Sequence, residues 1–181
     1  MGAVTVIPVG DDFVADNLAQ LPDDGNRYEL LDGLLLVSPS PAERHQRALV
    51  ELLVLLRDAC PPGLRVYAAP LDVRFTPRRQ VQPDLLVVED GPPRDRLDRL
   101  PLLVVELLSP GTRRHDLVLK RRAYEQAGVA SYWLVDPAVP SLTALELQGG
   151  HYVEVARVEG EQAWTAESPY AVTVVPADLL R

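Results

Sequence analysis

The stretch LLVVELLSPGTRRHDLVLKRRAYEQAGVASYWLVDP, residues 102–137, decides the fold that we predict for this chain. It begins with an apolar run that carries one carboxylate, Glu106, and it ends with a second apolar run, SYWLVDP. Short apolar runs are typical of strands that are buried on both faces of a sheet. An unpaired carboxylate in such a strand costs on the order of several kcal/mol, so we expect Glu106 to be paired, protonated or bound to a metal ion.

The segment between these runs, HDLVLKRRAYEQAG at residues 115–128, predicts a basic helix that ends at Gly128. Its helical spacing is expected to place Leu117, Lys120 and Tyr124 on one face. Lys120 is the single lysine among 18 basic residues. Lysine is a compact, titratable charge and arginine is not. This bias toward arginine suggests that position 120 requires an ammonium group, although chance alone would also account for a single lysine.

Strands and one long helix are predicted on either side of this stretch. Upstream, RYELLDGLLLV (residues 27–37) predicts a hairpin with its turn at Asp32 and Gly33, and residues 42–59 predict a helix with His45 in its first turn. The run VQPDLLVV (residues 81–88) predicts one strand. Because the residue before Pro83 must be extended, we expect Asp84 to lie at a defined edge where the chain enters this strand. Downstream, residues 144–158 predict a second hairpin, and the tail predicts a final strand and a short helix.

This order of elements favours an α/β (α+β) fold in which a central mixed β-sheet is flanked by helices. The length of 181 residues suits one domain with a sizeable core. Within a single domain spanning residues 1–181, we place the core at about 42–137. An N-terminal helix and hairpin are expected at 11–38, and a C-terminal hairpin and tail at 141–181.

Composition narrows the classes of function. One cysteine excludes a disulfide framework and a cysteine-based zinc cluster. Without a long apolar run or a basic N-terminal segment, the chain is expected to be soluble and cytoplasmic, with no membrane partner. The net charge of −8 argues against wholesale attraction to nucleic acid. Arg113, Arg114 and Arg121 nevertheless lie in a local basic cluster, which either contacts DNA or is a solvated face.

The carboxylates of Asp84 and Glu106 are expected to converge, because consecutive strands are commonly adjacent. Two oxygen ligands at a strand edge suit Mg²⁺, with Mn²⁺ as an alternative, and the backbone carbonyl of Leu107 is a candidate third ligand. Lys120 would orient or deprotonate a water molecule or stabilise developing charge, so the reaction class is phosphodiester hydrolysis. Each of these residues also has a purely structural explanation. Asp84 could be a turn residue, Glu106 could form an ion pair in the core, and Lys120 could be solvated on the helix surface.

Several blocks of the sequence are similar to a known family. The pair PD at residues 83–84, Glu106 within a strand and a lysine that follows resemble the PD-(D/E)XK nuclease superfamily. Over roughly residues 12–180, the blocks RYELLDGLLLVSPSP, VQPDLLVV, LLVVELLSPGTRRHD and AGVASYWLVDP resemble the Uma-type family of "putative restriction endonucleases". The resemblance implies a restriction-endonuclease-like core, with extra N- and C-terminal β-hairpins, and a Mg²⁺ site held by Asp84 and Glu106.

The resemblance also bears on three further positions. It implies that Glu29, in the first hairpin, lies near the site as a ligand or an orienting group, and it matches His45 to a family histidine. The superfamily lysine ordinarily lies two residues beyond the strand glutamate, where this chain has Leu108. A lysine relocated to the following helix would have to be Lys120.

Two functions remain open from the sequence. The first is a Mg²⁺-dependent endonuclease that hydrolyses DNA, expected as a homodimer because cutting a duplex needs two sites. The second is a catalytically inactive nuclease-fold protein that acts as a binding or regulatory module, which the acidic net charge favours. An enzyme acting on small phosphate esters is disfavoured because the sequence has no glycine-rich phosphate loop.

Overall fold

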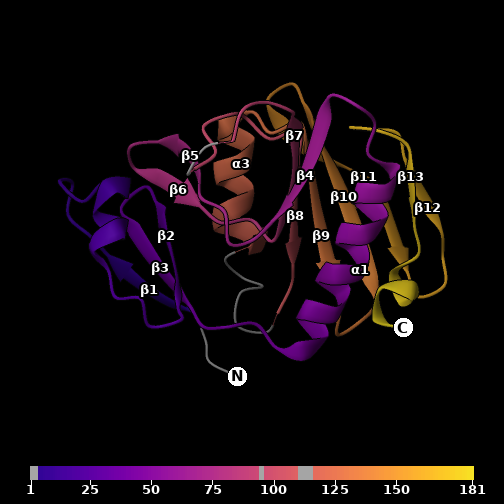
Figure 1. The fold of residues 1–181 in the computed structure, drawn as a ribbon, viewed down its shortest axis with the longest axis horizontal. Helices are drawn as coiled ribbons and strands as arrows, with labels where there is room; N and C mark the ends of the chain where they lie inside the picture. Colours follow the sequence, from indigo (N-terminus) through magenta and orange to yellow (C-terminus); the bar gives the residue numbers. More distant parts are fainter. Residues whose placement is uncertain (1–3, 94–95, 110–115) are drawn as a thin grey trace.

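A six-stranded mixed sheet forms the centre of the fold (Figure 1). The structure is a computed structural model that describes residues 4–93, 96–109 and 116–181. The central strands are β4 (Leu64–Ala68), β7 (Leu85–Glu89), β8 (Leu103–Leu107), β9 (Ser131–Asp136), β10 (Ser141–Gln148) and β11 (His151–Glu159). Their order is β11-β10-β9-β8-β7-β4. Strands β8 and β9 are parallel and the other neighbours are antiparallel, so the predicted mixed sheet is confirmed.

Helices cover both faces of this sheet. Helix α1 (Glu43–Ala59) packs on one face, where it meets alternate side chains such as Leu85 and Val105. A π-helical turn, η2 (Asp116–Lys120), leads into α3 (Arg121–Ala127) on the other face, beside Leu86 and Val104. Parallel neighbours need a crossover connection. The segment between β8 and β9, which contains α3, supplies it.

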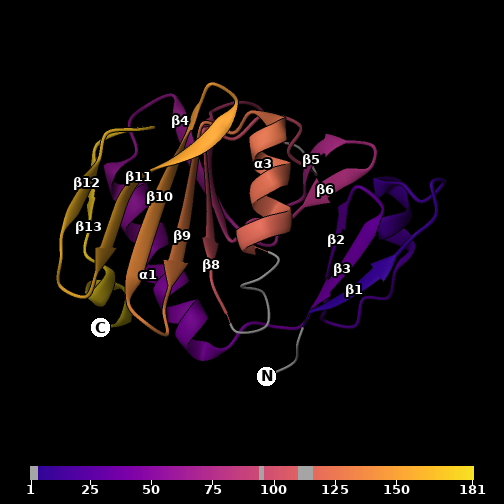
Figure 2. The ribbon, with the colours of Figure 1, turned by 180° about the vertical axis from the view of Figure 1, so that it is seen from behind.

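A second sheet lies beside α3, and Figures 1 and 2 show the helix between the two sheets. Its strand order is β1-β3-β2-β6-β5. The strands are β1 (Thr5–Pro8), β2 (Arg27–Leu31), β3 (Leu34–Ser38), β5 (Val73–Thr76) and β6 (Arg79–Val81). The predicted β2–β3 hairpin is confirmed, with positive φ at Asp32 (49°) and Gly33 (91°). Two positive φ values match the twist of paired strands, which favours an Asp-Gly turn.

Short elements complete the two ends of the chain. The N-terminal helix expected before the first hairpin is a short 3₁₀ helix, η1 (Ala15–Gln20). The predicted final strand is a two-stranded ribbon, β12 (Trp164–Ala166) and β13 (Val172–Val174), followed by the short helix η3 (Pro176–Leu180). The tail packs against α1, where the phenolic hydroxyl of Tyr170 donates to the Leu56 carbonyl at 2.7 Å. Among the described residues, no helix combines the length and apolarity needed to cross a membrane.

The prediction of one strand over residues 81–88 was wrong. Strand β6 ends at Val81 in the second sheet, and β7 begins at Leu85 in the central sheet. Pro83 lies between them and has no N–H to donate to a strand ladder. Residues 82–84 therefore form a link that carries the chain from one sheet to the other, and Asp84 lies at the point of entry into the central sheet.

The predicted face of the basic helix was also wrong in part. Leu117 is 38% exposed, whereas Lys120 is 1% exposed and Tyr124 is fully buried. The first turn is π-helical, and its i→i+5 bonding pattern changes the rotation between residues 117 and 120 relative to an α-helix. The helix still ends at Gly128, as predicted, where φ is 85°.

Candidate active site

Four charged side chains meet where the central sheet, the second sheet and α3 come together. Glu29 comes from β2, Asp84 from the link before β7, Glu106 from β8 and Lys120 from the end of η2. Their exposed fractions are 1%, 3%, 1% and 1%. Charged groups are almost never buried to this degree unless they are paired. Their contacts with one another therefore decide what this charged cluster can do.

Lys120 joins two of the carboxylates. Its Nζ lies 2.9 Å from Glu29 Oε1 and 3.1 Å from Glu106 Oε1. Glu29 Oε1 also accepts the backbone N–H of Gln82 at 2.8 Å. Burial raises the pKa of Glu29, but the charges of Lys120 and Arg27 outweigh it and hold that pKa below its ordinary value. Glu29 is therefore a carboxylate near neutral pH.

Tyr124 is a member of this cluster that the sequence did not identify as a site residue. Its hydroxyl donates to Glu106 Oε1 at 2.6 Å. Burial and the nearby charges of Glu106 and Glu29 raise the pKa of Tyr124 well above its ordinary value. The phenol therefore stays protonated and donates to Glu106. Its position four residues after Lys120, one helical turn, was the signal in the sequence.

Asp84 lies at the same edge of the central sheet as Glu106. The last ladder pair is Leu85 with Val105, so extending the antiparallel register by one residue sets Asp84 opposite Glu106. Asp84 Oδ2 accepts the backbone N–H of Leu107 at 2.8 Å and lies 3.2 Å from His45 Nε2. The predicted adjacency of the two carboxylate-bearing segments is confirmed. The Leu107 contact involves its N–H, and the proposed role of its carbonyl stays a prediction.

Arg27 contacts the second carboxylate oxygen of Asp84, and it was not predicted from the sequence as a site residue. Its Nη1 donates to Asp84 Oδ1 at 3.0 Å and to the Gln82 carbonyl at 3.1 Å, and its Nε lies 3.7 Å from Glu29 Oε2. Burial lowers the pKa of Arg27, but the charges of Glu29 and Asp84 raise it above its usual range. Burial by itself raises the pKa of Asp84. The hydrogen bond with His45 and the charge of Arg27 outweigh burial and hold that pKa well below its ordinary value.

The other sequence predictions have mixed outcomes. Leu108 is 7% exposed and packs in the same apolar cluster as Tyr124, so an apolar side chain fills the usual lysine position. Arg113 and Arg114 lie outside the described residues. Arg121 is exposed, and its Nη2 donates to the Tyr152 carbonyl at 3.1 Å. This bond ties α3 to β11, and contact of Arg121 with DNA stays a prediction.

The donor set of the cluster fits a hard cation. Asp84 and Glu106 are two carboxylates at one sheet edge, and Mg²⁺ is commonly held by one or two carboxylates, with water and phosphate as the remaining ligands. Glu29 Oε2 is buried and accepts no hydrogen bond from any described residue. Within the described part of the chain, however, no three Asp, Glu, His or Cys side chains are grouped closely enough to hold a metal ion by themselves. A metal held by Asp84 and Glu106 would therefore need water or phosphate oxygens to complete its coordination shell.

The lowered pKa values of Glu29 and Asp84 predict that the folded protein loses stability at acidic pH. Glu29 and Asp84 ordinarily titrate at 4.5 and 3.8, and their folded-state pKa values are lower. Their ionised forms therefore stabilise the fold above these ordinary values, and this contribution is lost as the pH falls toward the folded values. We expect the free energy of unfolding, measured in urea, to fall by about 2 kcal/mol or more between pH 5 and pH 3.

A matched pair of variants checks the source of this pH dependence. Asp84→Asn should flatten the decline, whereas Glu51→Gln, at an exposed position on α1, should leave it unchanged. A decline of equal size in both variants would place its origin outside the charged cluster.

The fold and the site together define a class of protein. A central mixed sheet with helices on both faces is the arrangement of the restriction-endonuclease-like fold, and the buried carboxylates and lysine lie at one edge of that sheet. The family model of Uma2, described as "Putative restriction endonuclease", matches residues 15–175. The chain belongs to the Uma2 family.

A solved structure supports the fold. The chain is similar to "a putative nuclease belonging to DUF820 from Anabaena variabilis ATCC 29413", with a TM-score of 0.78 and 18% sequence identity. The match covers 93% of this chain and 97% of that chain. A comparison with curated proteins finds no match.

Proposed function

We propose that the protein is a Mg²⁺-dependent endonuclease that hydrolyses phosphodiester bonds in DNA. The observation that carries this proposal is the position of Lys120. Lys120 is 1% exposed, and its Nζ lies within about 3 Å of both Glu29 and Glu106. The lysine thus reaches the edge of the sheet from the helix, while Leu108 fills the position where the superfamily carries its lysine.

Each residue of the charged cluster has a role in this proposal. Asp84 and Glu106 would hold the metal, with the Leu107 carbonyl as a further ligand. When bound, Mg²⁺ (or Mn²⁺) neutralises phosphate charge and lowers the pKa of a bound water. Lys120 would stabilise the charge that develops on the phosphate or hold the attacking water in place.

The remaining polar side chains act on these groups. Tyr124 fixes the orientation of Glu106 through its 2.6 Å hydrogen bond, and His45 fixes Asp84 in the same way from α1. Glu29 pairs with Lys120 and holds its Nζ atom beside Glu106. Arg113, Arg114 and Arg121 are the proposed contacts to the DNA backbone. Cleavage of both strands of a duplex in the cytoplasm would require a homodimer with two such sites.

Plasmid cleavage tests the proposal. We expect supercoiled plasmid to be nicked in Mg²⁺ or Mn²⁺ and to stay intact in EDTA. Asp84→Asn should lower the rate by at least about 100-fold, as expected when a group that positions charge in the reaction is lost. Asp90→Asn is the control, because Asp90 directly follows the other end of β7 and forms an exposed ion pair with Arg65. Cleavage that survives in Asp84→Asn would contradict the assignment of the site.

The charge balance of the cluster favours a second candidate, a nuclease-fold module that binds or regulates without catalysis. Three carboxylates already face the basic side chains of Arg27 and Lys120, and the Arg27 guanidinium donates to Oδ1 of Asp84, one of the two oxygens that this carboxylate could offer to a metal. Calorimetric titration with Mg²⁺ in the presence of DNA separates the two candidates. Binding of DNA with no uptake of metal would support the second.

A further inference from the structure

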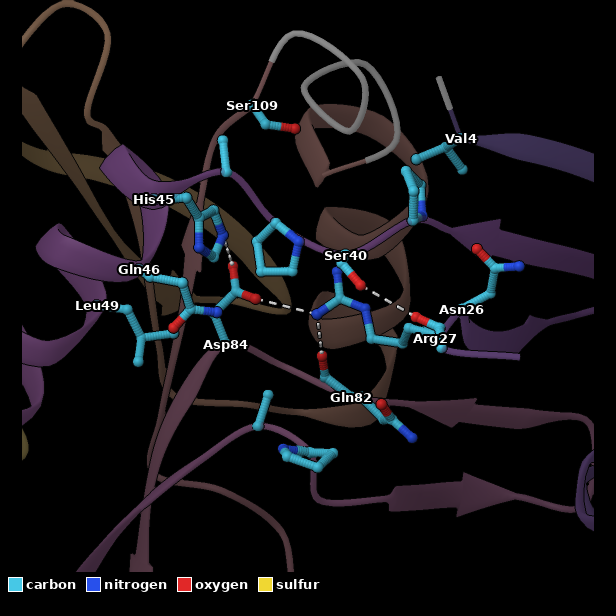
Figure 3. Close-up of a pocket in the computed structure, with 16 residues that line it drawn as sticks. Val4, Asn26, Arg27, Ser40, His45, Gln46, Leu49, Gln82, Asp84 and Ser109 are labelled. Carbon is cyan, nitrogen blue, oxygen red and sulfur yellow. Dashed lines mark hydrogen bonds and ion pairs between the residues drawn. The ribbon is translucent and has the colours of Figure 1, made fainter. Parts of the chain in front are cut away.

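A cavity of about 410 Å³ opens directly onto Asp84. It lies between the first turns of α1, the segment that leads into β2 and the segment that follows β3 (Figure 3). Figure 3 shows the Asp84 carboxylate between the His45 ring and the Arg27 guanidinium, with all three side chains on the cavity wall. The cavity therefore reaches the charged cluster at Asp84.

The burial of the cluster restricts how a phosphate can reach it. Asp84 lines this cavity, whereas Glu29, Glu106 and Lys120 do not line it and are each 1% exposed. A phosphate on a rigid duplex that lies across the protein surface cannot contact side chains at this depth. The reacting phosphate must therefore enter the cavity to approach Asp84.

The wall of the cavity combines apolar surface with hydrogen-bonding groups. Pro39, Pro70 and Leu49 supply flat or branched apolar surface. Asn26, Ser40 and Gln46 supply amide and hydroxyl groups, and all three are exposed at the rim. An extruded base is commonly held in this way, by stacking on apolar side chains and hydrogen bonds to its edge. Amides carry both donors and acceptors, as base edges do.

The charge of the wall suits one phosphate. Among the described residues that line the cavity, Arg27 is the one arginine or lysine, and its side chain is 21% exposed. Proteins that bind duplex DNA through its backbone neutralise many phosphates at once. A net charge of −8 and a single guanidinium in the cavity do not support that mode at this site.

We propose that this cavity is the subsite for one unpaired nucleotide, so that the protein acts on DNA whose target nucleotide is single-stranded, frayed or extruded from the duplex. The inference rests on the proposed function and narrows its substrate. The volume falls in the range of about 300–1,000 Å³ that is typical of sites for small ligands. One nucleotide fits this space and an intact base pair in a duplex does not. Extrusion costs about a few kcal/mol and least for a base that is already unpaired, so unpaired substrates should bind more tightly.

Binding of an oligonucleotide that contains 2-aminopurine tests the inference. The strand is presented alone and then in a fully paired duplex, with Ca²⁺ in place of Mg²⁺, and recovery of intact strand is checked on a gel. We expect the single strand to bind at least about ten-fold more tightly, because the duplex must first be opened at a cost of a few kcal/mol. Equal affinity for the two forms would overturn the inference.

Two tryptophan substitutions on α1 provide matched variants. Gln46→Trp places a large ring at the rim of the cavity, and we expect it to weaken single-strand binding by about ten-fold or more. Val54→Trp is the control, since Val54 is 37% exposed on the same helix and lies about 12 Å further along its axis. Both substitutions are at exposed positions, and unchanged thermal melting establishes that each variant is folded. Equal binding by the two variants would overturn the inference.

The outcomes also separate this inference from the proposed function. Cleavage of duplex and single strand at equal rates, with no effect of Gln46→Trp, would leave the endonuclease proposal standing and remove the nucleotide subsite. Tight binding of the single strand that Gln46→Trp abolishes, without cleavage of any strand in Mg²⁺, would support the subsite and remove the endonuclease.

Discussion

Lys120→Met is expected to lower the free energy of unfolding by about 3–5 kcal/mol and the rate of DNA cleavage by about 100- to 10,000-fold. The substitution preserves most of the apolar volume of the side chain but removes the ammonium. Glu29 and Glu106, each 1% exposed, then face each other across the cluster without the cation that bridges them. Urea denaturation and plasmid nicking measure the two effects.

Arg122→Met is the matched control for Lys120→Met. Arg122 is a basic residue of the same helical segment, but it is exposed. We expect its loss to change stability by less than about 0.5 kcal/mol, as is usual at the surface. If both variants lost activity equally, the effect would arise from the general basic charge of α3 rather than from the buried ammonium.

A double variant separates the two roles of Lys120. Adding Glu29→Gln to Lys120→Met removes one of the two stranded carboxylates, so part of the lost stability should return. Activity should not return, because the ammonium is still absent. Recovery of cleavage in the double variant would contradict the role that we propose for Lys120 on the reacting phosphate.

Arg27→Met is expected to make stability depend on Mg²⁺. Without Arg27, the carboxylates of Asp84 and Glu29 lose a cation, and we expect a loss of about 3 kcal/mol in EDTA. The vacated oxygen of Asp84 should then bind a divalent cation more tightly than in the wild type. Because a ligand stabilises the state that binds it, Mg²⁺ should raise the melting temperature of this variant and change that of the wild type little.

Thermal melting in EDTA and in Mg²⁺ measures this difference. Arg65→Met serves as the control, since Arg65 forms its ion pair with Asp90 at an exposed position outside the cluster. If the melting temperature of Arg27→Met did not change with Mg²⁺, Asp84 would not be a metal ligand, whatever the activity of the protein.

Much of this site could be predicted from the sequence because its acidic residues have local signatures. Glu106 is a carboxylate inside an apolar strand, and Asp84 follows a proline before another apolar run. Such positions predict burial and a specific partner without any knowledge of the tertiary structure. The resemblance to the family added Glu29 and His45, and the structure places Glu29 within the charged cluster and His45 beside Asp84.

The residues that were missed depend on packing between distant segments. Arg27 reaches Asp84 across 57 positions in the sequence, and it looked like an ordinary first residue of a hairpin strand. Tyr124 has the pattern of a core aromatic residue, and it becomes a site residue only because β8 directs Glu106 toward it.

Two local predictions were wrong for a similar reason. An apolar run indicated that residues 81–88 form one strand, and helical spacing indicated that Leu117 shares a face with Lys120. Tertiary structure divided the strand at Pro83, where the chain changes sheets, and it began the helix with a π-helical turn. Local patterns do not encode where a chain must leave one sheet for another.

Assembly of the charged cluster from segments far apart in the chain has a consequence for the newly made protein. Glu29 and Asp84 leave the ribosome before Glu106 and Lys120, and the central sheet between β8 and β9 closes only after Ser131 has been made. Until then, the acidic residues remain hydrated and the lysine that bridges them is absent or unplaced. We therefore expect any nuclease activity to begin only after β9 has been made and has paired with β8.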